Sequence, residues 1–147
     1  MGGQDFGSRT LETDAPVILV DTSIVVAWLD PDHPDHAACT QALDQCGAVD
    51  DLAISAITFA ELAAGGRTHD ALDEDLETFS RIPLDFDAAF RAGKAFSGYH
   101  PGKSARKPVL PDFLIRAQAA VLGVAHLTND RRRLASFPDV DFLFPEL

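Results

Sequence analysis

Residues 16–23 read Pro-Val-Ile-Leu-Val-Asp-Thr-Ser, and this short stretch decides the fold class. Its apolar residues 17–20 are continuous and mostly β-branched, which is typical of a strand buried on both faces of a parallel sheet. Asp21 follows that strand directly, and residues 23–29 predict a short helix. The segment therefore predicts a buried strand with polar side chains at its carboxyl end.

The rest of the chain alternates between short apolar runs and amphipathic segments. Further strands are predicted at 52–55, 81–84, 124–128 and 140–144, and further helices at 35–46, 58–64, 69–80, 85–99 and 111–122. A basic loop is expected between the last two helices, over residues 97–111. This alternation predicts an α/β fold, a three-layer α/β/α sandwich with a central parallel sheet and right-handed crossovers.

Length and composition favour one domain. The chain has 147 residues and is 46% apolar, which is enough for one continuous core. We expect a single domain over residues 16–147, preceded by a flexible N-terminal tail at 1–15. No apolar run approaches the ~20 residues that span a bilayer, and the N-terminus lacks the basic and apolar parts of a secretory signal. A cytoplasmic protein without a membrane segment is expected.

Charge is distributed unevenly along the chain. The formal net charge is −11, which by itself disfavours a nucleic-acid partner. However, residues 1–80 hold 2 basic and 16 acidic side chains, whereas residues 81–147 hold 10 basic and 7 acidic ones. The sequence thus allows an acidic pocket beside a basic surface. Contacts to the phosphates of a nucleic acid are expected from Lys103, Arg106, Lys107, Arg116 and Arg131, although a solvated polar surface explains any one of them equally well.

Four acids are expected to meet at one edge of the sheet. Asp21 follows the first strand, Glu61 lies near the start of the helix after the second, Asp112 opens a later helix, and Asp130 follows the fourth strand. In an open parallel sheet, the functional crevice lies beyond the carboxyl ends of the strands, where the strand order reverses. The sequence therefore places a candidate site at that edge.

Each acid also has a purely structural interpretation. Glu61 lies three residues after Thr58, the spacing of a capping box. Asp112 suits the positive end of a helix dipole, and Asp21 and Asp130 could be N-caps. Taken singly, these interpretations are at least as good as a functional one.

Taken together, the four carboxylates favour a metal site. They would repel one another unless a positive charge lay between them, and no lysine or arginine in these short motifs obviously fills that place. The chain contains no CxxC or HExxH motif, so any metal would use oxygen ligands. Mg²⁺ or Mn²⁺ prefers carboxylate and water, and an acidic pocket for such an ion is predicted.

The motifs that carry these acids resemble those of a PIN-domain ribonuclease of the VapC toxin type. They are Val20-Asp21-Thr22-Ser23, Ser55-Ala-Ile-Thr-Phe-Ala-Glu61-Leu62, Pro111-Asp112-Phe-Leu-Ile-Arg-Ala-Gln-Ala119 and His126-Leu-Thr-Asn-Asp130. Each motif is short, but the four occur in the family's order and at the expected strand ends. The resemblance runs from about Val17 to Phe144. Asn129 departs from it, because an arginine is common before the fourth acid.

The resemblance implies a function and a set of roles. The chain would be a Mg²⁺- or Mn²⁺-dependent endoribonuclease that arrests translation and is silenced by a VapB-type antitoxin. Asp21, Glu61, Asp112 and Asp130 would be the catalytic, metal-binding acids, and Thr22 or Ser23 would position phosphate or water. A homodimer is also expected. Two alternatives stay open: a PIN-like nuclease in RNA maturation or DNA processing, and a non-catalytic PIN scaffold.

Overall fold

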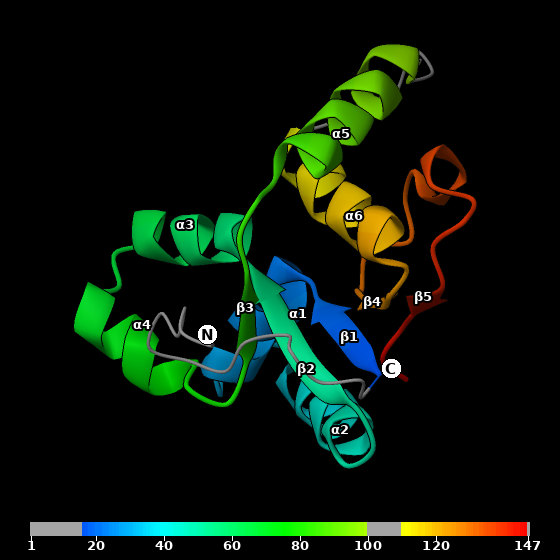
Figure 1. Ribbon diagram of the computed structural model, residues 1–147. Coiled ribbons are helices and arrows are strands. Elements are labelled where there is room, and N and C mark those ends of the chain that lie inside the picture. Colours follow the sequence, from blue (N-terminus) through cyan, green and yellow to red (C-terminus); the bar gives the residue numbers. More distant parts are fainter. Residues whose placement is uncertain (1–15, 100–109, 147) are drawn as a thin grey trace.

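The chain forms a five-stranded parallel sheet covered by helices on both faces (Figure 1). This computed structural model describes residues 16–99 and 110–146. The strands, in the spatial order β3-β2-β1-β4-β5, are β1 (Val17–Val20), β2 (Asp51–Ser55), β3 (Ser80–Ile82), β4 (Ala125–Leu127) and β5 (Phe142–Leu143). The helices are α1 (Thr22–Leu29), α2 (His36–Gly47), α3 (Ala56–Ala64), α4 (His69–Asp75), α5 (Phe86–Gly98) and α6 (Leu110–Leu122), with a short 3-10 helix at Leu134–Ser136.

Alternation of side chains along β1 explains the three layers. Ile18 and Val20 point into a core formed with α1, α2 and α4, whereas Leu19 points to the other face and packs with residues of α6. Leu19 and Val20 are fully buried, as a central strand covered on both sides requires. The predicted α/β/α sandwich with a central parallel sheet is therefore confirmed.

Three local expectations need correction. Helix α4 ends at Asp75 and not at residue 80, because the chain turns there to enter β3 at Ser80. Helix α3 begins at Ala56, since the Ser55 side chain accepts the N–H of Ile57 and caps the helix there. The 3-10 turn after β4 was not expected. Residues 1–15 and 100–109, where a tail and most of a basic loop were predicted, lie outside the described residues.

None of the helices within residues 16–99 and 110–146 is long and apolar enough to cross a bilayer.

Candidate functional site

The predicted acids border the point where the strand order reverses. Strand β1 pairs in parallel with β2 on one side and with β4 on the other. The chain therefore leaves β1 toward β2 on one side of the sheet and later returns to β4 on the other side. A crevice opens at such a switch point in parallel sheets, outside the carboxyl ends of the strands. Asp21 follows β1 there, and Thr128 and Asp130 follow β4.

Asp21 is held by two hydroxyl groups. It is 8% exposed, and its Oδ2 accepts hydrogen bonds from Thr128 Oγ1 at 2.7 Å and from Ser23 Oγ at 3.0 Å. Its Oδ1 lies 3.9 Å from Nε2 of the buried His126 and accepts no hydrogen bond from the described residues. One oxygen of Asp21 is thus fixed in place, while the other is available to a cation.

Glu61 reaches the crevice from the second turn of α3. Thr22 Oγ1 donates to Glu61 Oε1 at 2.7 Å and also lies 2.8 Å from Thr58 Oγ1. The capping-box interpretation is therefore wrong: the helix begins before Thr58, and the buried Thr58 hydroxyl meets Thr22. Thr22, predicted to position phosphate or water, here orients a carboxylate. Ser23 does the same for Asp21.

Asp112 lies in the first turn of α6, within electrostatic reach of Asp21. Burial raises the pKa of Asp112, the charge of Asp21 raises it further, and Arg133 and Arg116 offset part of the rise. Burial also raises the pKa of Glu61, against the hydrogen bond from Thr22, and the charges of Asp112 and Asp21 add to the rise. Since these charges act on one another, the first three predicted acids share one electrostatic environment.

Asp130 is in a different state from the other three. The Arg132 guanidinium donates to both its oxygens, at 2.9 Å from Nε and 3.0 Å from Nη2, and the Arg132 backbone N–H donates at 2.9 Å. Burial acts to raise the pKa of Asp130, but these hydrogen bonds and the charges of Arg132 and Arg116 outweigh it, and the pKa is lowered. Asp130 is thus an ionised and already paired carboxylate.

Two arginines lie among the acids, where the sequence predicted no basic side chain. Arg133, whose side chain is 5% exposed, donates to Asp112 Oδ2 at 3.1 Å. Arg116 is 3% exposed and donates to the backbone carbonyls of Asp130 at 3.0 Å and Arg132 at 2.7 Å. Burial lowers the pKa of Arg116, while Asp130, Asp21 and Asp112 act to raise it.

Arg116 could have been recognised from the sequence, whereas Arg133 could not. Arg116 lies four residues after Asp112, which places both on one face of α6. The expectation that Arg116 contacts RNA phosphate from the surface is therefore wrong, because its guanidinium is buried under the loop after β4. The position of Arg133 depends on the left-handed backbone of that residue, which has no sequence signature here.

Among the other predicted RNA contacts, Arg131 is exposed, and its guanidinium lies over the Phe144 ring at 3.9 Å from the centroid. It stays available for phosphate. Lys103, Arg106 and Lys107 lie outside the described residues.

The donor set at the crevice fits a hard divalent cation, since carboxylates and hydroxyls supply only oxygen. The distances between these acids limit how many of their oxygens could contact one ion directly. Within the described ranges, only His69, Asp70 and Asp73 form a group of three potential ligands whose atoms all lie within 4.8 Å of one another. The crevice acids therefore stand further apart, and water would complete their coordination, as Mg²⁺ usually requires.

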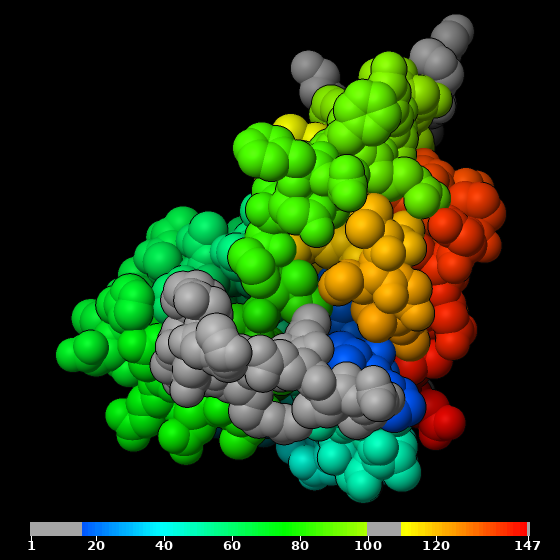
Figure 2. Space-filling model, viewed as in Figure 1, coloured from blue at the N-terminus to red at the C-terminus, as the bar shows by residue number. Residues whose placement is uncertain are grey.

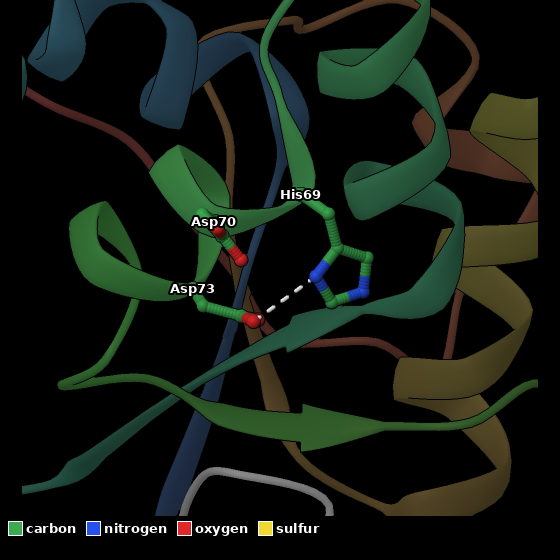
Figure 3. A group of neighbouring side chains, drawn as sticks. All are labelled: His69, Asp70 and Asp73. Atoms are coloured by element: carbon green, nitrogen blue, oxygen red, sulfur yellow. Dashed lines mark ion pairs between the residues drawn. The ribbon is translucent and has the colours of Figure 1, made fainter.

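The group on α4 is an ion-pair network at the surface (Figure 3). Asp73 lies 3.0 Å from His69 Nδ1 and 2.7 Å from Arg81 Nη2, and all three side chains are partly or largely exposed. Because Asp73 already has two basic partners, this group is satisfied without a metal.

Comparison with known proteins finds one matching family and several similar folds. Residues 18–143 match the PIN domain family. A toxin-antitoxin complex from Klebsiella pneumoniae is 27% identical, with a TM-score of 0.63, covering 84% of this chain and 94% of that one. VapBC2 from Rickettsia felis, bound to a DNA fragment of its promoter, is 21% identical with a TM-score of 0.67, covering 88% and 99%.

A third structure, VapC20 of Mycobacterium tuberculosis, is described as a toxin that cleaves the sarcin-ricin loop. It is 17% identical with a TM-score of 0.61, covering 84% of this chain and 98% of that one. None of the curated proteins compared with the chain matches it. The family match spans most of the chain and includes all four predicted acids, so the chain belongs to the PIN domain family.

Proposed function

We propose that this protein is a metal-dependent endoribonuclease, the toxin of a type II toxin-antitoxin module of the VapC kind. It hydrolyses phosphodiester bonds of RNA and thereby inhibits translation. The PIN domain supports a nuclease, and the structural neighbours include toxin-antitoxin complexes and a toxin that cuts RNA. We also propose that residues 16–147 act as one domain in the cytoplasm, where such an RNA substrate is found.

A single observation supports this proposal: Asp21, Glu61 and Asp112 lie within electrostatic reach of one another near the carboxyl ends of the strands. The three residues come from different segments of the chain. The charge of Asp21 raises the pKa of both Glu61 and Asp112, and the charge of Asp112 also raises that of Glu61. A fold has no structural need to gather three mutually repelling carboxylates in one crevice, since repulsion lowers stability. Such an arrangement favours a site that binds something positive.

We propose that Mg²⁺ or Mn²⁺ is that partner, held by Asp21, Glu61 and Asp112. A divalent cation supplies Lewis-acid stabilisation of the scissile phosphate and lowers the pKa of water. The chain's own part is positional. Thr128 and Ser23 fix Asp21, and Thr22 fixes Glu61, so that the carboxylates are oriented before any ion arrives.

We propose a VapB-type antitoxin as the protein partner. A cavity of about 380 Å³ lies between α1 and α3, and it is lined by Val26, Leu29, Leu62 and Gly65 and by the charged residues Asp30, Glu61 and Arg67. Arg67 already pairs with Asp75, so an apolar peptide segment with a basic side chain would fit this cavity: its apolar part meets the aliphatic residues and its charge meets Asp30 and Glu61.

We also propose that the protein is a homodimer. Helix α5 stands out from the body of the molecule (Figure 2) and leaves Phe86 92% and Phe90 67% exposed. Exposed neighbouring aromatic side chains of this kind favour burial against a second surface. Sedimentation of the purified chain would measure its oligomeric state and so test this proposal.

Induction in a host that lacks the antitoxin tests the toxin function. Expression of the wild type should stop growth, whereas Asp21→Asn should not, because the amide cannot replace the charge that holds a cation. Asp44→Asn is the matched control, since Asp44 is an exposed acid on α2, outside the crevice. Unimpaired growth with the wild type would contradict the proposal. Sequencing of RNA ends after brief induction identifies the cleaved RNA.

Cleavage by the purified protein decides between the alternatives. With Mn²⁺, the protein should cut structured RNA in preference to single-stranded DNA, and chelation should abolish cutting. Preference for DNA would favour the DNA-processing alternative. Absence of both cleavage and divalent-ion binding would favour the non-catalytic scaffold. Failure to co-purify with the small protein encoded next to it would remove the antitoxin assignment.

A further inference from the structure

Arg133 occupies part of the acidic crevice and is held there by the fold. Its Nη2 lies 3.1 Å from Asp112 Oδ2 and 3.7 Å from Asp130 Oδ2, so the guanidinium bridges two of the four acids. Its side chain is 5% exposed, whereas that of the neighbouring Arg132 is 53% exposed. Arg133 is thus an interior cation and not part of the solvated surface.

The backbone at Arg133 shows that this placement has a cost. Its φ of 61° and ψ of 27° lie in the left-handed region, and among the described residues it is the only non-glycine with positive φ. A non-glycine residue is strained in this conformation, because its Cβ lies too close to the backbone carbonyl. Its buried Nε also lacks a hydrogen-bond partner among the described residues. The ion pairs with Asp112 and Asp130 offset these costs.

Hydrogen bonds to the buried side chains of Arg116 and Thr128 fix the loop that carries Arg133. Arg116, buried in α6, donates to the carbonyls of Asp130 and Arg132, the residues on either side of Arg131. The Asp130 backbone N–H donates to Thr128 Oγ1 at 3.1 Å. Because both sides of the loop are bonded to buried side chains, the Arg133 guanidinium has a defined position in the crevice.

Hydrogen bonding divides the four acids into two pairs. Both oxygens of Asp130 accept hydrogen bonds from Arg132, and one oxygen of Asp112 accepts from Arg133. Asp21 and Glu61, by contrast, accept side-chain hydrogen bonds only from hydroxyl groups among the described residues, and His126 lies near Asp21. The guanidiniums of Arg116, Arg132 and Arg133 offset about three of the four carboxylate charges, which leaves less negative charge than two divalent ions would neutralise.

We propose that Arg133 takes the place of a second metal ion: the crevice binds one divalent cation, through Asp21, Glu61 and the free oxygen of Asp112, while Asp130 serves to anchor arginine. This inference rests on the proposed function, because it concerns the same metal site. It gives Arg133 a positioning role and limits the stoichiometry of the site to one ion per chain.

Titration of the metal-free protein with Mn²⁺, followed by calorimetry and by the electron paramagnetic resonance of free Mn²⁺, tests the proposal without any RNA. The wild type should bind one ion, and Arg133→Met should bind two, because the substitution frees the Asp112 carboxylate and removes the positive charge that lies between Asp112 and Asp130. Arg91→Met is the matched control: it also releases a carboxylate from an arginine, that of Asp139 at 2.7 Å, but on the surface. It should still bind one ion.

A second variant covers the case in which Arg133→Met does not fold. Asp130→Asn should leave the stoichiometry at one, with a change in affinity far smaller than the tenfold or greater loss expected for a lost ligand. Two ions in the wild type, one ion in a folded Arg133→Met, or a tenfold loss in Asp130→Asn would each overturn the inference while leaving the metal site intact. Absence of any Mn²⁺ binding to the wild type would overturn the proposed metal dependence as well.

Discussion

The hydroxyl of Thr128 should contribute more to stability than any other single hydroxyl at the site. Thr128 is fully buried, donates to Asp21 Oδ2 at 2.7 Å and accepts the backbone N–H of Asp130 at 3.1 Å. Thr128→Val keeps the shape of the side chain but removes both hydrogen bonds. Asp21 retains the Ser23 hydroxyl, whereas the Asp130 N–H is left with no replacement on this side chain.

The expected loss follows from these two hydrogen bonds. A hydrogen bond to a charged group contributes about 1.5–3 kcal/mol, and a neutral one about 0.5–1.5 kcal/mol. The free energy of unfolding should therefore fall by roughly 2–4 kcal/mol. For a chain of this length, about 3 °C of melting temperature corresponds to each kcal/mol, so the midpoint should fall by roughly 6–12 °C.

Thermal unfolding in metal-free buffer measures this effect, with Thr40→Val as the matched control. The Thr40 hydroxyl is buried in α2 and has no hydrogen-bond partner among the described residues. Its replacement by valine removes an unsatisfied polar group and should leave the midpoint unchanged or raise it. Mn²⁺ affinity provides a second measurement: Thr128→Val should weaken it about 10-fold or more, because Asp21 loses an orienting partner.

Two results would refute this reasoning. If Thr128→Val melts at the wild-type temperature, the hydrogen bonds to Asp21 and to the Asp130 backbone do not stabilise the fold. If Thr40→Val is destabilised as much as Thr128→Val, the loss reflects the change from threonine to valine and not the geometry of the site.

Three further predictions concern residues around the same edge. Because the pKa of Glu61 is raised in the folded protein, the free energy of unfolding should fall as pH rises from the ordinary glutamate pKa through the raised one. Glu61→Gln should remove this part of the pH dependence. In metal-free buffer, the variant should therefore melt at a higher temperature than the wild type at neutral pH but not at acidic pH. Arg116→Met should lower the free energy of unfolding by about 3 kcal/mol, measured by urea denaturation, since two backbone carbonyls of the loop after β4 and the nearby acids lose their buried cation; an unchanged midpoint would contradict its interior role. Gly123→Ala should cost about 1 kcal/mol in the same assay, because φ is 68° at this helix end although a Cβ would meet no atom within 4 Å; a stabilised variant would show that the strain is absent.

Local patterns were sufficient for most of the secondary structure. Apolar residues dominate every strand except β3, which is Ser-Arg-Ile, and periods of 2 and 3.6 residues separate strands from helices without any knowledge of contacts. The errors occurred where a local pattern suited two structures. Residues 76–80 continue the apolar spacing of α4, but Leu76 and Phe79 fill the core from a turn instead. Likewise, Thr58 and Glu61 have the spacing of a capping box, but Ser55 had already capped the helix.

The sequence by itself determined that the acids would stand at strand ends and helix starts, because strand and helix boundaries are local properties of the chain. Tertiary structure alone decided which side chains from distant parts of the sequence the acids meet. Pairing of β4 beside β1 brings Thr128 to Asp21, across 107 positions of the sequence. The left-handed backbone of Arg133 then turns its own side chain inward to Asp112. Such contacts depend on strand order and on one backbone angle, which no local pattern encodes.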